Sequence, residues 1–154
     1  MDVSKINSLV ELYFKKVEQI DKKKPFLQWL NPKNNHQYNW EEVTEKIYKF
    51  SYKIKSLIKE GDRVLLLSEN RPEWLIADLA IMNAGGITVP IFTTYAERDY
   101  EYILKDCSPS LIVVSNDIQF EKINKFIDNQ EIISFEKIKT SSISFESIFN
   151  EKYE

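Results

Sequence analysis

The middle of the chain alternates short apolar runs with longer segments that carry helical patterns. Three runs are rich in valine, leucine and isoleucine and predict strands: Arg63 to Ser68, Ile87 to Pro90 and Leu111 to Ser115. Between them, Glu73 to Ala84 is apolar on nearly every side, and Ala96 to Asp106 is amphipathic. Because a parallel neighbour is reached only through a covering crossover, this order predicts βαβ units. We therefore expect an α/β fold, with a short, mainly parallel sheet covered by helices on both faces.

The N-terminal segment, residues 1–24, has a helical pattern. Apolar residues recur every three or four positions from Ser4 to about Asp21, which predicts an amphipathic helix whose apolar stripe faces the domain. The alternative is a helix on a membrane surface, but Glu11 and Glu18 dilute the basic face that such helices favour. The segment also lacks an apolar signal-peptide core. Cytoplasm is the expected location, with peripheral attachment to a membrane surface as the alternative.

A hairpin and a second helix are expected before the first parallel strand. Two short runs with aromatic residues flank a polar turn and predict a small antiparallel hairpin near residues 26–40. Asn39 and Glu42 have the spacing of a capping box, so the second helix should open at Asn39. Its apolar face continues towards Gly61, which is a candidate for the residue that ends the helix.

The C-terminal part of the pattern is weaker. Asp117 is expected to cap a further helix that runs to about Asp128, and Glu131 to Ser134 predicts a fourth short strand. Residues 135–154 are expected to form a weakly structured tail, in which Ser144 to Glu154 forms a short frayed helix. The length of 154 residues suits one domain, residues 1–154.

Composition and charge exclude several classes of protein. A net charge of -3 lacks the basic footprint of a nucleic-acid binder. The apolar runs fall far short of the roughly 20 residues of a membrane span, so no transmembrane segment is expected. One cysteine cannot form an internal disulfide, and one histidine cannot supply a histidine-based zinc cluster. We interpret Cys107 as a packing or surface thiol and His36 as a solvated turn residue, and we assign no catalytic residue and no metal ligand.

The loop after the second strand is the first place to search for a ligand site. Pro90 cannot donate to a central ladder, so it should mark a strand end or an edge. Phe92, Thr93 and Thr94 then leave from the carboxyl end of a parallel strand, where open α/β sheets bind ligands. A strand-end turn with satisfied hydroxyls is the alternative.

Arg71 and Pro72 form a turn into the apolar helix. Pro72 suits the first helical turn, where its missing N–H has no partner to lose. Arg71 either pairs with a nearby carboxylate and fixes this turn, or orients a partner domain or an anionic ligand. The candidates for the carboxylate are Glu69, Glu73 and Asp78. We interpret Trp74 and Met82 as core residues rather than ligand-lining ones.

The sequence contains neither G-x-G-x-x-G nor G-x-x-x-x-G-K-[ST], and its three glycines cannot build the usual glycine-rich phosphate cradle. Dispersed carboxylates give no nucleophile or metal constellation. The residues alone therefore predict an α/β domain without a visible active site.

The central stretch nevertheless resembles the N-terminal part of the AMP-forming acyl-CoA synthetases, most closely the long-chain fatty-acid–CoA ligases. The residues that carry the resemblance are Tyr38-Asn39-Trp40-Glu41-Glu42-Val43, Gly61-Asp62-Arg63-Val64, Leu67-Ser68-Glu69-Asn70-Arg71-Pro72-Glu73-Trp74, Ala77-Asp78-Leu79-Ala80, Ala84-Gly85-Gly86, Val89-Pro90-Ile91 and Tyr102-Ile103-Leu104. The resemblance covers about residues 8 to 116. The run from Ser68 to Trp74 is fairly specific to the long-chain branch, whereas Gly61 to Val64 is shared by the wider adenylate-forming superfamily.

The resemblance implies a two-step ligase reaction. Fatty acid and ATP give an acyl-adenylate and pyrophosphate, and coenzyme A (CoA) then displaces AMP to form the thioester. ATP, Mg²⁺ and CoA are thus implied for the full-length family enzyme, with fatty acid and CoA as its partners. By the same resemblance, Phe92, Thr93 and Thr94 lie in the loop that approaches the pantetheine and acyl channels.

The chain departs from the family where the chemistry would be. It has no counterpart of the TSGTTG-x-P-K-G loop, because Lys139-Thr140-Ser141-Ser142 contains no glycine. We expect a truncated or split copy that binds no cofactor by itself, is inactive alone, and has the missing remainder or a second copy as partner. The alternatives are a stand-alone binding or interaction module with the same scaffold, or part of another adenylate-forming enzyme.

Overall fold

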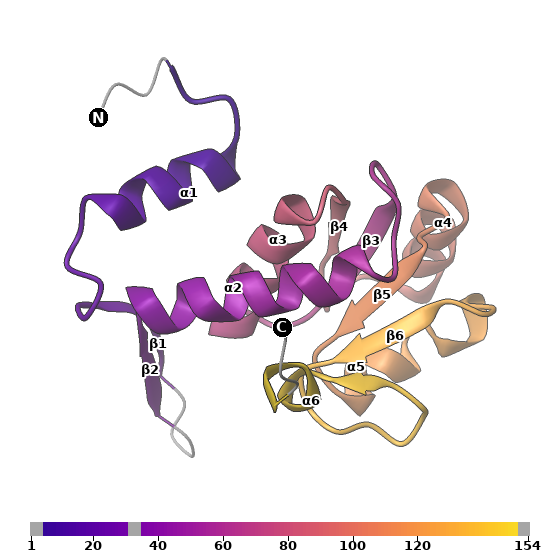
Figure 1. Ribbon diagram of the computed structural model, residues 1–154. Helices are drawn as coiled ribbons and strands as arrows, with labels where there is room; N and C mark the ends of the chain where they lie inside the picture. The colour runs from indigo at the N-terminus through magenta and orange to yellow at the C-terminus, as the bar shows by residue number, and fades with distance from the viewer. Residues whose placement is uncertain (1–4, 31–34, 151–154) are drawn as a thin grey trace.

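Five parallel strands form the centre of the fold. The computed structural model describes residues 5–30 and 35–150 and orders the strands β4-β3-β5-β6-β7 (Figure 1). Their bounds are Ile87–Ile91 for β4, Arg63–Leu67 for β3, Leu111–Val114 for β5, Glu131–Ser134 for β6 and Ile143–Ser144 for β7. Every neighbouring pair is parallel, so the predicted sheet is confirmed. Pro90 lies on the edge strand β4, opposite Leu66, as predicted for a residue without an N–H donor.

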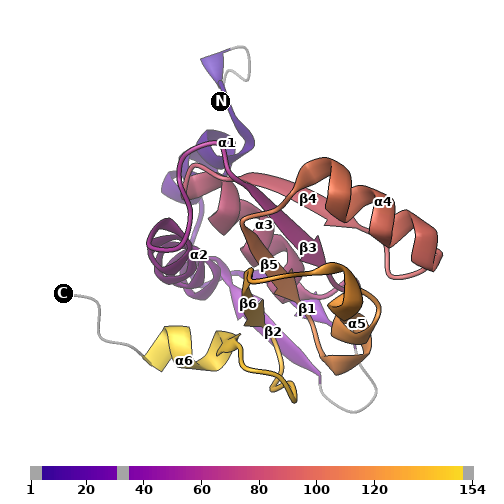
Figure 2. The ribbon, with the colours of Figure 1, turned by 90° about the vertical axis from the view of Figure 1, so that its right-hand side faces the viewer.

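The sheet is buried on both faces because its strands send alternate apolar side chains into two separate cores. Val64 and Leu66 of β3 pack with the first core, while Leu65 and Leu67 pack with the second. The first core is covered by α2 (Trp40–Lys55), α3 (Pro72–Asn83), α1 (Leu9–Glu18) and α6 (Phe145–Asn150). The second is covered by α4 (Glu97–Cys107) and α5 (Asp117–Glu121) (Figure 2). The expected covering of both faces is confirmed.

The N-terminal helix is shorter than its apolar pattern. Helix α1 begins after Ser8, whose side chain accepts a hydrogen bond from the Glu11 N–H, and it buries Tyr13 and Val17. The predicted start at Ser4 lies outside the described residues. No helix in the described ranges is both long and apolar enough to span a membrane.

The predicted hairpin is confirmed. Strand β1 (Pro25–Trp29) pairs antiparallel with β2 (His36–Asn39), with Trp29 opposite His36. Residues 31–34 of the predicted turn lie outside the described ranges.

The start of α2 follows the prediction, but its end does not. Asn39 and Glu42 form the capping box. The helix ends at Lys55 with Ser56 as its C-cap, not at Gly61. Gly61 instead has φ +81° in the turn before β3 and donates its N–H to the Gly85 carbonyl. The apolar pattern continues beyond the end of the helix because the side chains of Leu57 and Ile58 also pack against the core.

Helix α3 is apolar on nearly every side because it lies between other elements. Pro72 is its first residue, as expected. Ile76, Ala77 and Ala80 are fully buried, while Trp74 and Met82 are half-buried and pack against the first core.

The C-terminal part contains more structure than the sequence pattern indicated. Asn116, not Asp117, caps α5, and this helix ends at Glu121 before a separate turn, η2 (Asn124–Phe126). The predicted helix to Asp128 is therefore wrong. Helix α6 confirms the short helix predicted within Ser144 to Glu154, of which residues 151–154 lie outside the described ranges. Strand β7 was not predicted and lies within the stretch expected to be weakly structured. Helix α6 buries Phe145 against Phe50 and Phe135, with ring centroids 5.2 Å from each.

Candidate functional site at the carboxyl edge of the sheet

The loops that follow the parallel strands β3, β4, β5 and β6 leave from one edge of the sheet. Backbone bonds align this edge: the Ser115 N–H donates to the Leu67 carbonyl at 3.1 Å, and the Glu136 N–H to the Ser115 carbonyl at 2.9 Å. Such an edge is the usual ligand site of an open α/β sheet. It is therefore the candidate site here.

The loop after β4 is held by its backbone and presents side chains outward. The Tyr100 hydroxyl donates to the Phe92 carbonyl at 2.9 Å, and Lys122 Nζ donates to the Thr93 carbonyl at 2.6 Å. The Phe92 side chain is 68% exposed and meets the Tyr95 ring edge-on at 5.3 Å. Thr94 is exposed. The loop thus offers an aromatic side chain and hydroxyl groups on a fixed backbone.

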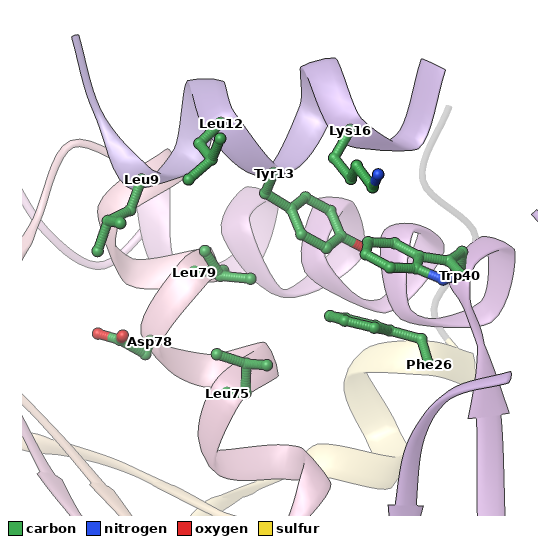
Figure 3. Close-up of a pocket in the computed structure, with 9 residues that line it drawn as sticks. All are labelled: Leu9, Leu12, Tyr13, Lys16, Phe26, Trp40, Leu75, Asp78 and Leu79. Atoms are coloured by element: carbon green, nitrogen blue, oxygen red, sulfur yellow. The ribbon is translucent and has the colours of Figure 1, made fainter. Parts of the chain in front are cut away.

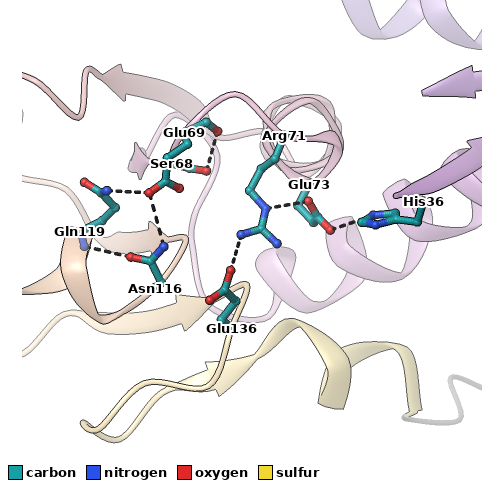
Figure 4. Close-up of polar contacts among 8 residues, drawn as sticks. All are labelled: His36, Ser68, Glu69, Arg71, Glu73, Asn116, Gln119 and Glu136. Atoms are coloured by element: carbon teal, nitrogen blue, oxygen red, sulfur yellow. Dashed lines mark hydrogen bonds and ion pairs between the residues drawn. The ribbon is translucent and has the colours of Figure 1, made fainter. Parts of the chain in front are cut away.

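A fixed carboxylate is linked to this loop through Gln119, whose Oε1 accepts from Lys122 Nζ at 2.8 Å. Glu69 Oε1 accepts hydrogen bonds from Gln119 Nε2 at 2.6 Å and Asn116 Nδ2 at 3.3 Å (Figure 4). The Gln119 N–H in turn donates to Asn116 Oδ1 at 3.2 Å. Burial alone would raise the pKa of Glu69, but the polar groups of Ser115, Gln119 and Asn116 lower this pKa below its ordinary value. Glu69 is therefore charged at neutral pH and joins the β3–α3 loop to the start of α5.

Arg71 is held between two carboxylates. Its Nε donates to Glu73 Oε2 at 2.8 Å and its Nη1 to Glu136 Oε1 at 2.6 Å (Figure 4). The guanidinium also lies over the Trp29 ring, 4.6 Å from the centroid. Burial would lower the pKa of Arg71, but the hydrogen bonds from its guanidinium to Glu73 and Glu136 raise it.

Arg71 therefore has a carboxylate partner that the sequence suggested, Glu73, and one that it did not, Glu136. With only 8% of its side chain exposed and two acidic partners, Arg71 is not a free cation for an anionic ligand. Glu136 lies just beyond β6, separated from its last residue, Ser134, by Phe135. Because the carboxyl ends of parallel strands meet at one edge, the position of Glu136 after a predicted strand could have indicated that it lies at this site.

The structure contradicts the prediction for His36 and agrees with a packing role for Cys107. His36 is not a solvated turn residue: it lies half-buried on β2, with Nε2 3.7 Å from Glu73 Oε1 and its ring edge-on to Trp29 and Tyr38. Cys107 is buried at the end of α4. Burial raises the pKa of the Cys107 thiol, which disfavours the reactive thiolate at neutral pH.

The described residues form neither a metal-ligand cluster nor a glycine-built phosphate cradle at the candidate site. No three His, Cys, Asp or Glu side chains within residues 5–30 and 35–150 are arranged to hold a metal ion. Gly61, Gly85 and Gly86 all lie in turns before β3 and β4, at the opposite edge of the sheet. A glycine-built phosphate cradle is therefore not formed at the candidate site.

Comparison with known proteins identifies the family. Residues 14–152 match the family model described as AMP-binding enzyme. The chain belongs to the AMP-binding enzyme family. Together with the curated relatives described next, this match confirms the predicted resemblance to AMP-forming acyl-CoA synthetases.

Curated relatives of this AMP-binding chain are long-chain-fatty-acid–CoA ligases. The chain is 36% identical over 66 residues to ligase ACSBG2 of Gallus gallus. The matched segment covers 43% of this chain and 9% of that ligase. It is 35% identical over 60 residues to the ligase FadD15 of Mycobacterium bovis. That match covers 39% of this chain and 10% of FadD15. The matched segment thus spans about a tenth of the length of these relatives.

Solved structures share the fold. The anthranilate CoA ligase AuaEII matches 97% of this chain with a TM-score of 0.79 at 22% identity, and this match covers 30% of AuaEII. A luciferase-like enzyme of the mealworm Zophobas morio matches 96% of this chain with a TM-score of 0.78 at 20% identity, over 35% of that enzyme. These likenesses concern the fold, which the AMP-binding chain shares over nearly its whole length.

Proposed function

We propose that this chain forms the N-terminal part of the large domain of a long-chain fatty-acid–CoA ligase. The reaction is adenylation of a fatty acid by ATP, with release of pyrophosphate, followed by displacement of AMP by CoA. The observation that carries the proposal is the family match over residues 14–152, together with curated relatives that are long-chain ligases. The run from Ser68 to Trp74 supports the long-chain branch in particular.

In this proposal the chain contributes the frame and one wall of the substrate channels. Phe92, Thr93 and Thr94 face the pantetheine and acyl channels. The outward position of the Phe92 side chain and the backbone anchors of the loop support this role. Glu69 is a positioning residue, because it ties the β3–α3 loop to α5 beside this wall.

We further propose that the 154 residues do not turn over by themselves. Adenylation requires hydrogen-bond donors or cations that stabilise the charge on the polyphosphate. Loss of one such group typically slows a reaction by about 10²-fold or more. The candidate edge provides no glycine-rich loop, and its arginine is already paired with Glu73 and Glu136.

The test is release of pyrophosphate by the purified chain with oleate, ATP, Mg²⁺ and CoA. We expect no release above the rate without protein, whereas a full-length relative such as FadD15, assayed in parallel, should release pyrophosphate. Release by the chain that requires both oleate and ATP would show that these residues contain an adenylation site, and would contradict the proposal.

A further inference from the structure

An apolar hollow lies between α1, α3 and the β1–α2 region (Figure 3). Its volume is about 390 Å³, within the range of roughly 300–1,000 Å³ that is typical of small-ligand sites. Leu12 of α1 and Leu75 and Leu79 of α3 form its aliphatic sides. None of its lining residues belongs to the loops at the carboxyl edge of the sheet.

One end of the hollow is a rigid aromatic wall. The Phe26 and Trp40 rings stack with centroids 3.7 Å apart, and the Tyr13 ring stacks on Trp40 at 5.8 Å. The Tyr13 hydroxyl is hydrogen-bonded to Thr44 Oγ1 at 2.9 Å, which leaves the ring face towards the hollow. A preformed wall lowers the entropic cost of binding, because few side chains must be ordered.

The two charged residues of the hollow have opposite signs and lie at opposite ends. Figure 3 shows Lys16 above the aromatic wall and Asp78 beyond Leu75 and Leu79. Within the part of the chain that the structure describes, neither Lys16 nor Asp78 has an ion-pair partner. The neighbouring Lys15, by contrast, is paired with Glu11 at 2.6 Å.

From this geometry we infer that the hollow binds a free fatty acid, with its carboxylate at Lys16 and its hydrocarbon chain along Leu12, Leu75 and Leu79. A sugar or a nucleotide would leave its polar groups unpaired against such walls. Asp78 repels a carboxylate, so the head group is directed to the Lys16 end. The hydrocarbon chain gains from burial against aliphatic and aromatic surface.

This site goes beyond the proposed function, because it binds fatty acid without ATP and away from the loop of Phe92. It would hold a second fatty acid molecule on the scaffold, separate from the molecule that is adenylated.

The test is a fluorescence titration of the 154-residue chain with cis-parinaric acid below its critical micelle concentration. We expect saturable binding. Lys16→Gln should weaken it about three- to fivefold, the equivalent of one exposed ion pair. Lys15→Gln is the matched control and should leave the affinity unchanged. Competition by oleyl alcohol, which has no carboxylate, should be the same for the wild type and Lys16→Gln.

A second variant tests the hollow itself. Leu12→Trp places a larger side chain in the space and should reduce binding at least tenfold, with the circular dichroism spectrum and melting temperature used to verify folding.

The inference is overturned if no saturable binding occurs, if Lys15→Gln weakens binding as much as Lys16→Gln, or if Leu12→Trp has no effect. If Phe92→Ala abolishes binding and Leu12→Trp does not, the fatty acid binds at the carboxyl edge, which overturns this inference and supports the proposed function. If the chain dimerises in sedimentation experiments and Leu12→Trp makes it monomeric, a second copy occupies the hollow and the inference also fails.

Discussion

At the scale of single residues, Arg71 forms two ion pairs whose carboxylates differ in exposure to solvent. Arg71 and Glu73 each have 8% of their side chains exposed, while Glu136 is 51% exposed. The two ion pairs of Arg71 therefore differ in solvent screening. The Arg71–Glu73 pair should stabilise the turn into α3, and the Arg71–Glu136 pair should contribute little.

This difference is testable by substitution. Arg71→Ala should lower the free energy of unfolding by roughly 3 kcal/mol, because Glu73 is left nearly buried without its cation. Glu136→Gln should cost at most about 1 kcal/mol, since water already competes for that carboxylate. Urea denaturation of both variants and the wild type gives the comparison. Equal effects for the two variants would mean that Glu73 does not depend on Arg71.

At the scale of elements, a short helix was expected at α6, but its burial in the core was not. Phe145 and Ile148 are buried, yet this helix has only six residues, too few for an apolar period to stand out. Its position depends on Phe50 of α2 and Phe135 after β6, which are distant in sequence. For α5, Asn116 and Asp117 are both common N-cap residues, and it is the Asn116 side chain that accepts from the Gln119 N–H, while it also donates to the distant Glu69.

The contribution of α6 to stability can be measured. Phe145→Ala should destabilise the chain by about 3 kcal/mol, because it removes a buried ring that contacts three other phenylalanines. Ile118→Ala is the control: this side chain on α5 is 69% exposed, and its loss should cost about 0.5 kcal/mol or less. Chemical denaturation checks both. An effect of Phe145→Ala as small as that of Ile118→Ala would mean that residues 135–150 are not part of the cooperative unit.

By contrast, elements with strong local signals were predictable. Strands β3, β4 and β5 follow from runs of β-branched and leucine residues, and the start of α2 follows from the spacing of Asn39 and Glu42. The site was predictable only in outline. The loop of Phe92 follows from the strand before it, but the partners of Glu69 and Arg71 come from α5 and the end of β6, and no local pattern joins them.

At the scale of the whole molecule, the two faces and two edges of the sheet have different roles. The cores on both faces stabilise the scaffold, the amino edge contains the three glycines, and the carboxyl edge gathers the polar groups. The chain belongs to the AMP-binding enzyme family, and no cluster of three potential metal ligands occurs among residues 5–30 and 35–150. We propose that this scaffold is the frame of a long-chain fatty-acid–CoA ligase.

The most direct test is a chimera in which residues 14–152 replace the corresponding segment of a full-length long-chain ligase such as Gallus gallus ACSBG2. We predict that the chimera forms oleoyl-CoA from oleate, ATP and CoA, and that Val113→Asp in the central strand β5 abolishes this activity with loss of folding. A chimera that folds like the parent enzyme but forms no thioester would contradict the claim.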